Sequence, residues 1–138
     1  MISIIWRTAT SMKYIGVDYG TKKVGIALSD ESGTFAFPHS VVSNERALSR
    51  VAALAEEYGV SHIVLGESRE LSGKPNPVMA GIAAFEATLR KRGFMTHLEP
   101  EYFSTAEAGR TDEREKVRDA QAAAIILQSF LDKQNASA

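Results

Sequence analysis

Residues 15–28 read IGVDYGTKKVGIAL, and this stretch decides the fold. Two short apolar runs flank a turn, and Asp18 stands at the end of the first run. A carboxylate in an apolar strand is costly to bury unless it is paired or binds a metal ion. Gly16 and Gly20 remove side chains around it, so that backbone or ligand can approach closely. The pattern predicts a strand, a tight turn and a returning strand with Asp18 at the centre of the sheet. A plain turn-capping aspartate is the equal alternative.

The rest of the chain alternates strand and helix patterns. Residues 45–58 carry apolar side chains at the spacing of one helical face, with Asn44 able to cap the start and Gly59 to close the end. The remaining segments are predicted as a strand at 35–42, a strand at 62–66, a polar loop at 67–76, a helix at 77–92, a strand at 95–101, a short helix capped by Ser104, an exposed charged stretch at 109–118 and a helix at 119–131. The order β-β-β-α-β-α-β-α indicates an α/β domain with a mixed sheet and helices packed on it.

The composition is that of one globular domain. The chain has 138 residues, of which 44% are hydrophobic and 24% are charged. It has no cysteine, which excludes a disulfide framework and favours a cytoplasmic location. No apolar run in the sequence approaches the length of a membrane span. Residues 1–12 are interpreted as a dispensable extension, with an edge strand or a contact to another chain as the alternative, and residues 13–138 as a single domain.

Two further acids are candidates for the same site as Asp18. Glu101 ends the fifth predicted strand, and Glu99 would share its sheet face if Pro100 leaves the strand regular. One of these glutamates is a candidate ligand and the other a solvated acid. Asp119 opens the predicted last helix, where an acid also simply favours the helix dipole. Small residues follow it, so the helix can lie close to the sheet and bring this acid near Asp18.

Three carboxylates from distant parts of the chain favour a metal-dependent reaction. Oxygen ligands are those that Mg²⁺ and Mn²⁺ prefer. Two such ions about 4 Å apart would activate water and stabilise the leaving oxygen in phosphodiester hydrolysis. The motif around Asp18 by itself fits both ribonuclease H-like nucleases and actin-like ATPases or sugar kinases. An actin-like ATPase needs two such domains around a nucleotide cleft, and 138 residues cannot supply both.

The combined pattern resembles the YqgF/RuvX family, whose members are described as Holliday-junction-resolvase-like proteins or as pre-16S ribosomal RNA nucleases. The resemblance covers about residues 13–133. It is carried by the segments 16–27 (GVDYGTKKVGIA), 63–66 (IVLG) through Gly73, 100–105 (PEYFST) and 119–128 (DAQAAAIILQ). It implies a ribonuclease H-like fold and a metal-dependent nuclease. The family's metal-binding acids fall on Asp18, Glu101 and Asp119.

Three features depart from the family pattern. Glu67 stands where the family usually has Gly-x-Pro, Pro100 and Tyr102 replace the Asp and Arg beside the second acid, and the loop before Asp119 looks shorter. All three acids are retained, so these departures concern substrate contact, because an arginine near the site would normally be a phosphate partner. Glu67 is interpreted as a loop acid, with an extra metal or substrate ligand as the alternative.

Basic residues near the predicted site are candidates for contacts with phosphates. The net charge is only −1, but an acidic catalytic cluster would cancel basic residues in the sum. For each of them a solvated surface residue is the plain alternative. The candidate substrate-binding residues are Lys22, Lys23, Arg110, Arg114, Lys116 and Arg118. The three histidines, His39, His62 and His97, show no metal-ligand spacing and are interpreted as structural.

Three hypotheses of function follow from these residues. The first is a metal-dependent endonuclease that uses Mg²⁺ or Mn²⁺ to hydrolyse structured nucleic acid, with RNA in ribosome maturation preferred over branched DNA on the resemblance alone. The second is a non-catalytic nucleic-acid-binding protein that retains the fold. The third is a nucleotide phosphatase or ATPase that uses the turn at Asp18. Resolution of branched DNA would need two symmetric sites and hence a homodimer, which no sequence feature establishes.

Overall fold

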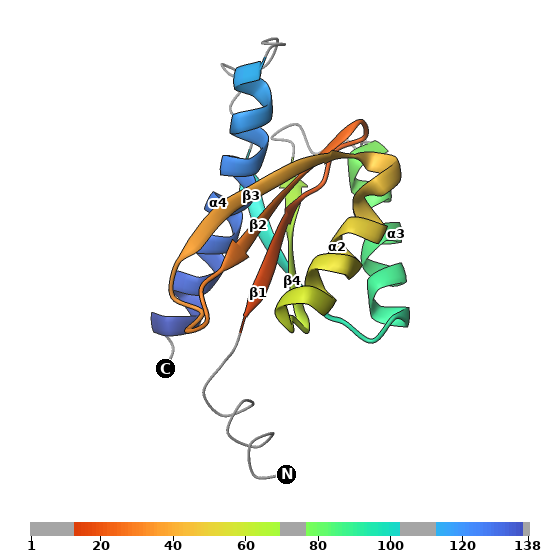
Figure 1. The fold of residues 1–138 in the computed structure, drawn as a ribbon. Helices are drawn as coiled ribbons and strands as arrows, with labels where there is room; N and C mark the ends of the chain where they lie inside the picture. Colours follow the sequence, from red (N-terminus) through yellow and green to blue (C-terminus); the bar gives the residue numbers. More distant parts are fainter. Residues whose placement is uncertain (1–12, 70–76, 103–112, 137–138) are drawn as a thin grey trace.

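The computed structural model describes residues 13–69, 77–102 and 113–136. Its elements follow the predicted order of three strands and then alternating helices and strands (Figure 1). They are β1 (Tyr14–Asp18), β2 (Lys23–Ser29), β3 (Ala36–Ser43), α2 (Asn44–Tyr58), β4 (His62–Arg69), α3 (Pro77–Lys91), β5 (Met95–Tyr102) and α4 (Glu113–Ala136).

The five strands form one mixed sheet in the order β3-β2-β1-β4-β5. The first three strands pair antiparallel through their short turns, whereas β1 pairs parallel with β4 and β4 parallel with β5. The carboxyl ends of β1, β4 and β5 therefore meet at one edge of the sheet. Asp18 ends β1 and Glu101 is the last residue but one of β5, so the topology brings both backbones to that edge.

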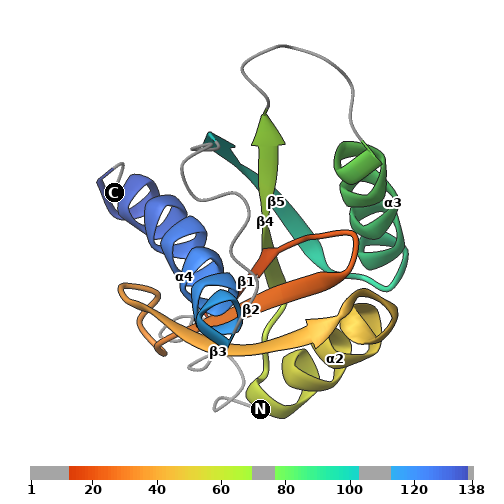
Figure 2. The ribbon, with the colours of Figure 1, turned by 90° about the horizontal axis from the view of Figure 1, so that it is seen from above.

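Helices cover both faces of the sheet (Figure 2). On one face α2 and α3 enclose a core that includes Ile15 and Val17 of β1. On the other face α4 packs through Ala123 and Leu127 onto a second core. Side chains alternate across a strand, so the two sheet faces are supplied by alternate residues of β1. Residues at even positions of this strand, including Asp18, belong to the face that α4 covers.

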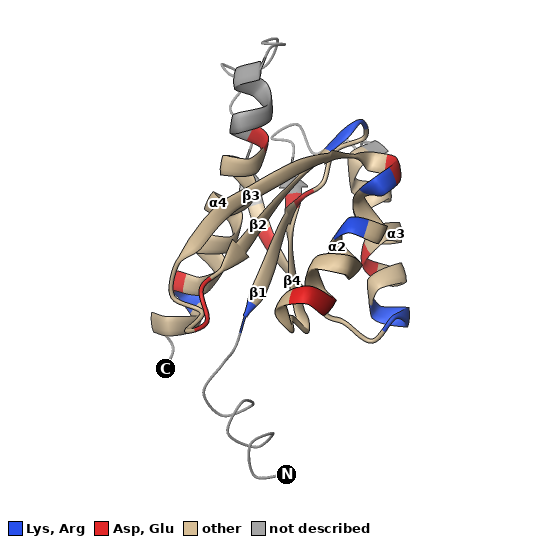
Figure 3. Cartoon of the chain, viewed as in Figure 1, with Lys and Arg blue, Asp and Glu red and all other residues tan. Residues whose placement is uncertain are grey.

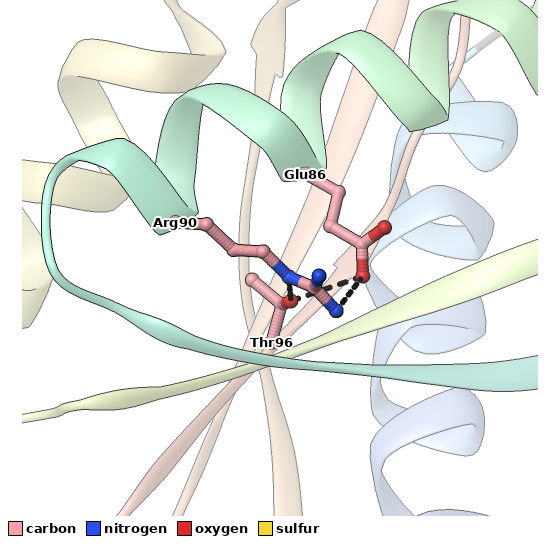
Figure 4. A network of polar contacts seen from close by, with 3 residues as sticks. All are labelled: Glu86, Arg90 and Thr96. Carbon is pink, nitrogen blue, oxygen red and sulfur yellow. Dashed lines mark hydrogen bonds and ion pairs between the residues drawn. The ribbon is translucent and has the colours of Figure 1, made fainter.

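Polar contacts fasten α3 to the edge strand β5 (Figure 4). The Thr96 hydroxyl donates to a Glu86 carboxylate oxygen at 2.9 Å, and Arg90 Nε donates to the same hydroxyl at 2.8 Å. Arg90 also pairs with Glu86 one turn earlier at 3.3 Å. These groups hold β5 from the α3 side and thereby fix the strand that carries Glu101.

The predicted boundaries of α2 agree with the structure to within one residue. Asn44 is the first residue of the helix rather than its cap, and Ser43 takes the cap position. Gly59 follows the helix with a left-handed φ of 68°, and its N–H donates to the Ala55 carbonyl. A glycine adopts this conformation at little cost, which is why the helix ends there.

Two predicted boundaries are wrong. Glu67 was expected in a loop, but β4 continues through Arg69, because its pairing with β5 runs on to the match of Arg69 with Tyr102. The last helix was expected to begin at Asp119, but α4 begins at Glu113. The predictions for residues 1–12 and for the short helix at Ser104 lie outside the described residues.

In the part of the chain that the structure describes, no helix is both long and apolar enough to pass through a lipid bilayer.

Candidate active site

Asp18 lies at the carboxyl end of the central strand and pairs with Gly25 of β2. The neighbouring Gly16 shows how tightly α4 packs on this face, since a Cβ added to it would lie 2.7 Å from Leu127 Cβ. Asp18 has the same parity as Gly16 along β1 and therefore belongs to the face of α4. Its side chain is half-buried, at the open end of the second core.

Asp119 reaches the same place from α4. A Cβ added to Gly25 would overlap the Asp119 carbonyl oxygen, so the helix backbone rests directly on this glycine. Because Gly25 is the strand partner of Asp18, the two aspartates come from neighbouring backbones on one face of the sheet. Asp119 is the seventh residue of α4, so its interpretation as a helix-opening acid that favours the dipole is wrong: the dipole acts within the first turn.

The backbone of Glu101 lies two strands from β1. Gly66 pairs with Glu99, and Leu65 pairs with Val17, so Asp18 stands level with Glu99 and two residues behind Glu101. Neighbouring strands are about 4.8 Å apart, which gives a lateral separation of about 10 Å. The side chain of Glu101 is outside the described residues. Among the side chains that are described, no three acids or histidines form a group that could hold a metal ion.

Glu99 is buried and links β5 to α4 through its carboxylate, a contact that we call the lock. The expectation that the second glutamate would be solvated is therefore wrong. Its residue is only 4% exposed. One carboxylate oxygen accepts from the Ser129 hydroxyl at 2.8 Å and from Lys133 Nζ at 2.6 Å. Both partners come from the far end of α4. Pro100 leaves the strand regular. β5 is an edge strand that pairs only with β4 among the described strands, and an edge strand tolerates a proline because one of its sides has no strand partner.

The turn that follows Asp18 is held by two neighbouring helices. The Tyr19 ring packs against Phe85 at a centroid distance of 5.4 Å and fills the space that Gly81 leaves free on α3. The Asn44 side chain donates to the Gly20 carbonyl at 2.8 Å, and the Asn44 N–H donates to the Lys22 carbonyl at 2.9 Å. These contacts fix the turn that carries the predicted phosphate contacts.

The predicted basic residues have different outcomes. Lys22 and Lys23 are exposed in and after the turn beside Asp18. The prediction of a loop around Arg114, Lys116 and Arg118 is wrong, because these residues lie in the first two turns of α4. Their side chains, and all of Arg110, lie outside the described residues.

Two of the three histidines form a structural pair near the amino ends of β4 and β5, opposite the ends at which Asp18 and Glu101 lie. The ring nitrogens His62 Nδ1 and His97 Nε2 are 3.0 Å apart, and both rings contact Tyr14. Phe130 of α4 covers His97 at a centroid distance of 4.8 Å. Burial lowers the pKa of His62 and of His97 below the ordinary value of 6.5, and His62 lowers that of its neighbour further.

The sequence matches a known family over almost its whole length. The model of the family described as "RuvX: Holliday junction resolvase" matches residues 12–133. The chain belongs to the RuvX family. This RuvX chain is therefore a nuclease, as the sequence predicts. Relatives carry the name "Putative pre-16S rRNA nuclease". The relative from Anaplasma marginale is 35% identical over 87% of this chain and 84% of its own length. The relative from Geobacillus kaustophilus is 37% identical over 88% of this chain and 98% of its own length.

Solved structures confirm the ribonuclease H-like fold of this RuvX chain. Thermus thermophilus RuvC superimposes with a TM-score of 0.56 at 14% identity, covering 91% of this chain and 97% of RuvC. The same protein in complex with a Holliday junction substrate gives a TM-score of 0.53, also at 14% identity, over 89% and 95% of the two chains.

The sequence did not single out Gly25 or Asn44 as parts of the site of this RuvX chain. The sequence did contain a signal for Gly25, because this glycine belongs to the returning strand of the motif at 16–27. What could not be seen was that α4 crosses the sheet there. Asn44 looked like an ordinary helix cap, and its second function as a clamp on the turn depends on the position of α2 beside β2.

Proposed function

We propose that the chain is a metal-dependent endonuclease that hydrolyses phosphodiester bonds in structured nucleic acid. Asp18, Glu101 and Asp119 are its catalytic acids and metal ligands. The observation that supports this is the contact of the Asp119 backbone with Gly25, the strand partner of Asp18. It brings two acids that are 101 positions apart in the sequence onto one face of the sheet.

The donor set fits a hard divalent cation. The acids offer only carboxylate oxygens, and the chain has no cysteine that would favour a softer metal. A bound Mg²⁺ or Mn²⁺ would supply an activated water and stabilise the leaving oxygen. The parallel strands β1 and β5 would present Asp18 and Glu101 from the sheet edge, and α4 would present Asp119 from above it.

The surroundings of Asp18 prepare this site before a substrate binds. Tyr19 and Asn44 hold the turn that follows the acid, so its backbone loses little further freedom when a phosphate arrives. Lys22 and Lys23 at this turn would attract the phosphate backbone, as would Arg110, Arg114, Lys116 and Arg118 before Asp119.

We further propose that the substrate is RNA, in 5′-end processing of pre-16S ribosomal RNA. The support is the name of relatives with 34–37% identity. Branched DNA is the second candidate, supported by the family description. It would require a homodimer with two symmetric sites. Residues 13–138 would act as one nuclease domain in the cytoplasm.

The replacement Asp18→Asn tests the proposed reaction. It keeps the size of the side chain but removes the charge, so we expect cleavage of a precursor RNA in Mg²⁺ to be abolished while the Tm is retained. Glu57→Gln is the control, since this exposed acid lies in the last turn of α2. Full activity of purified Asp18→Asn would refute the assignment.

The non-catalytic alternative is a nucleic-acid-binding protein with the same fold, and the departures at Pro100 and Tyr102 favour it. Binding of RNA and branched DNA by the unmodified chain, with no cleavage of either in Mg²⁺ or Mn²⁺, would support this alternative. A hydrolysis assay with free ATP separates both from a nucleotide phosphatase.

A further inference from the structure

The start of α2 is fastened to the turn beside Asp18. Asn44 donates from its side chain to the Gly20 carbonyl and from its backbone to the Lys22 carbonyl. The start of α2 therefore lies at the same edge of the sheet as Asp18, although α2 covers the opposite face from α4. A duplex that reaches Asp18 and continues across the turn at Gly20 would meet the charges at the start of α2.

Two arginines follow Asn44 on this helix. Arg46 and Arg50 are four residues apart, so they share one face of α2 and are about 6 Å apart along its axis. Both are exposed, and neither has an ion pair with another described residue. We refer to Lys22, Arg46 and Arg50 together as the basic strip, and Figure 3 shows basic positions both in the turn after β1 and on α2.

Other cations of the described chain are arranged differently. Lys13 pairs with Glu31, Arg90 with Glu86, and Lys133 with Glu99. Lys91 and Arg92 stand at the end of α3, where cations favour the helix dipole. The basic strip therefore differs from these cations in having neither an acidic partner nor a helix end that would stabilise it.

The charges on α2 oppose the stability of the helix. A cation near a helix start is unfavourable, as are acids near its end, and α2 has Arg46 in its first turn and Glu56 and Glu57 in its last turn. Like charges four residues apart also repel each other. Glu45 in the first turn has the sign that the dipole favours, but it lies about 100° around the helix from Arg46. An arrangement that costs stability indicates a role in binding.

We propose that the basic strip binds the sugar-phosphate backbone of a nucleic-acid duplex, next to the segment that reaches Asp18. Lys22 contacts the phosphates nearest the acid, and the two arginines contact successive phosphates of one strand. Contacts of this kind position a duplex without reading its sequence. The inference rests on the proposed function, because it takes nucleic acid as the substrate.

The test measures binding without metal, so that cleavage does not enter. A fluorescein-labelled RNA duplex two helical turns long is titrated with the full chain in EDTA over a range of KCl concentrations. Each neutralised phosphate contributes a factor of about eight to affinity at about 0.1 M salt, so Arg46→Ala with Arg50→Ala should weaken binding about 50-fold. The slope of log K against log salt should become shallower by about 2.

Two further variants make the result specific. Lys91→Ala with Arg92→Ala removes the same charge from the far end of the molecule and should leave the slope unchanged. Arg46→Lys with Arg50→Lys keeps the charge and should restore the slope. The double alanine variant should also keep or raise the Tm, because the repulsion between two cations four residues apart is removed. An unchanged affinity and slope, or a lowered Tm, would overturn the proposal. A slope change in a chain that cleaves nothing would leave the strip standing and reject the nuclease.

Discussion

Gly25 is the residue through which the strand and the helix of the candidate site meet. It has no side chain to hold α4 away from β2, so the backbone of Asp119 can rest on it. Asp18 could be predicted from its apolar neighbours, because a charge there needs a partner. The importance of Gly25 could not, because it depends on a contact between residues 94 positions apart in the sequence.

At this scale we expect Gly25→Ala to separate the two aspartates. The added methyl group would overlap the Asp119 carbonyl oxygen, so α4 must shift away from the sheet. Overpacking of this kind costs about 1–3 kcal/mol of unfolding free energy. A shift of about 1 Å at a catalytic group also costs about 100-fold in rate. Urea unfolding and single-turnover cleavage measure the two effects.

Gly59→Ala is the control for this prediction. Gly59 has a φ of 68° and no atom within 4 Å of an added Cβ, so the loss comes from backbone strain alone. We expect about 1–2 kcal/mol of destabilisation with the cleavage rate retained. Equal rate losses in both variants would show that stability, not the position of Asp119, controls activity.

At the scale of elements, β5 is held from both faces. α3 fastens it through Glu86 and Arg90, and α4 through the lock on Glu99. The helices and strands with clear apolar periodicity were predicted correctly. The extensions were missed for physical reasons. Residues 113–118 hold five charged residues and one apolar residue, Val117, so their sequence has no apolar helical periodicity, and the end of β4 is polar and is defined by its pairing with β5.

We expect Lys133→Ala to destabilise the chain more than Glu99→Gln. The first replacement leaves a carboxylate with a 5% exposed side chain without its ammonium partner, which costs about 1–3 kcal/mol. The second leaves a neutral amide that can still bond Ser129, and Lys133 is exposed enough to be solvated. Urea unfolding measures both, with Lys91→Ala as the control. The reverse order would contradict the assigned lock.

The histidine pair joins β4 to β5 and predicts a pH dependence of stability. Both pKa values are lowered in the folded chain, so the unfolded chain binds protons more readily. The contribution of the two neutral histidines to the free energy of unfolding is therefore fully present above about pH 6.5, and it is lost as the pH falls below that value. We expect the urea midpoint to drop across this window and the drop to shrink in His97→Gln. An equal drop in both chains would assign it to other groups.

At the scale of the whole molecule, every buried apolar side chain of the described residues lies between Tyr14 and Leu131. The core clusters and the strand pairs of the described residues lie within that span. We expect a chain that begins at Lys13 to show the Tm of the full chain by calorimetry. A Tm lower by several degrees would assign residues 1–12 a part in the folded structure and contradict their interpretation as dispensable.

The net charge does not show how the charged residues are arranged on the molecule. The total of −1 gives no indication of a nucleic-acid surface. The basic residues nevertheless differ in their partners: Lys22, Arg46 and Arg50 have no ion pair with another described residue, whereas Lys13, Arg90 and Lys133 each pair with an acid. Sequence alone could give the number of basic residues but not which of them are neutralised by a neighbour.

The long helix α4 acts as a lever arm. Its far half is held by Gln128, which bonds Ala36 of β3 and the Thr34 carbonyl, and by Ser129 and Lys133, which bond Glu99 of β5. Asp119 is 14 residues from Lys133, or about 21 Å along the axis. A tilt of about three degrees at the grip would therefore displace Asp119 by about 1 Å, enough to slow a reaction strongly. Mutational surveys should accordingly find rate-determining positions around Gln128, remote from any bond that is broken, and inhibitors that wedge the helix there would act without entering the cleavage site.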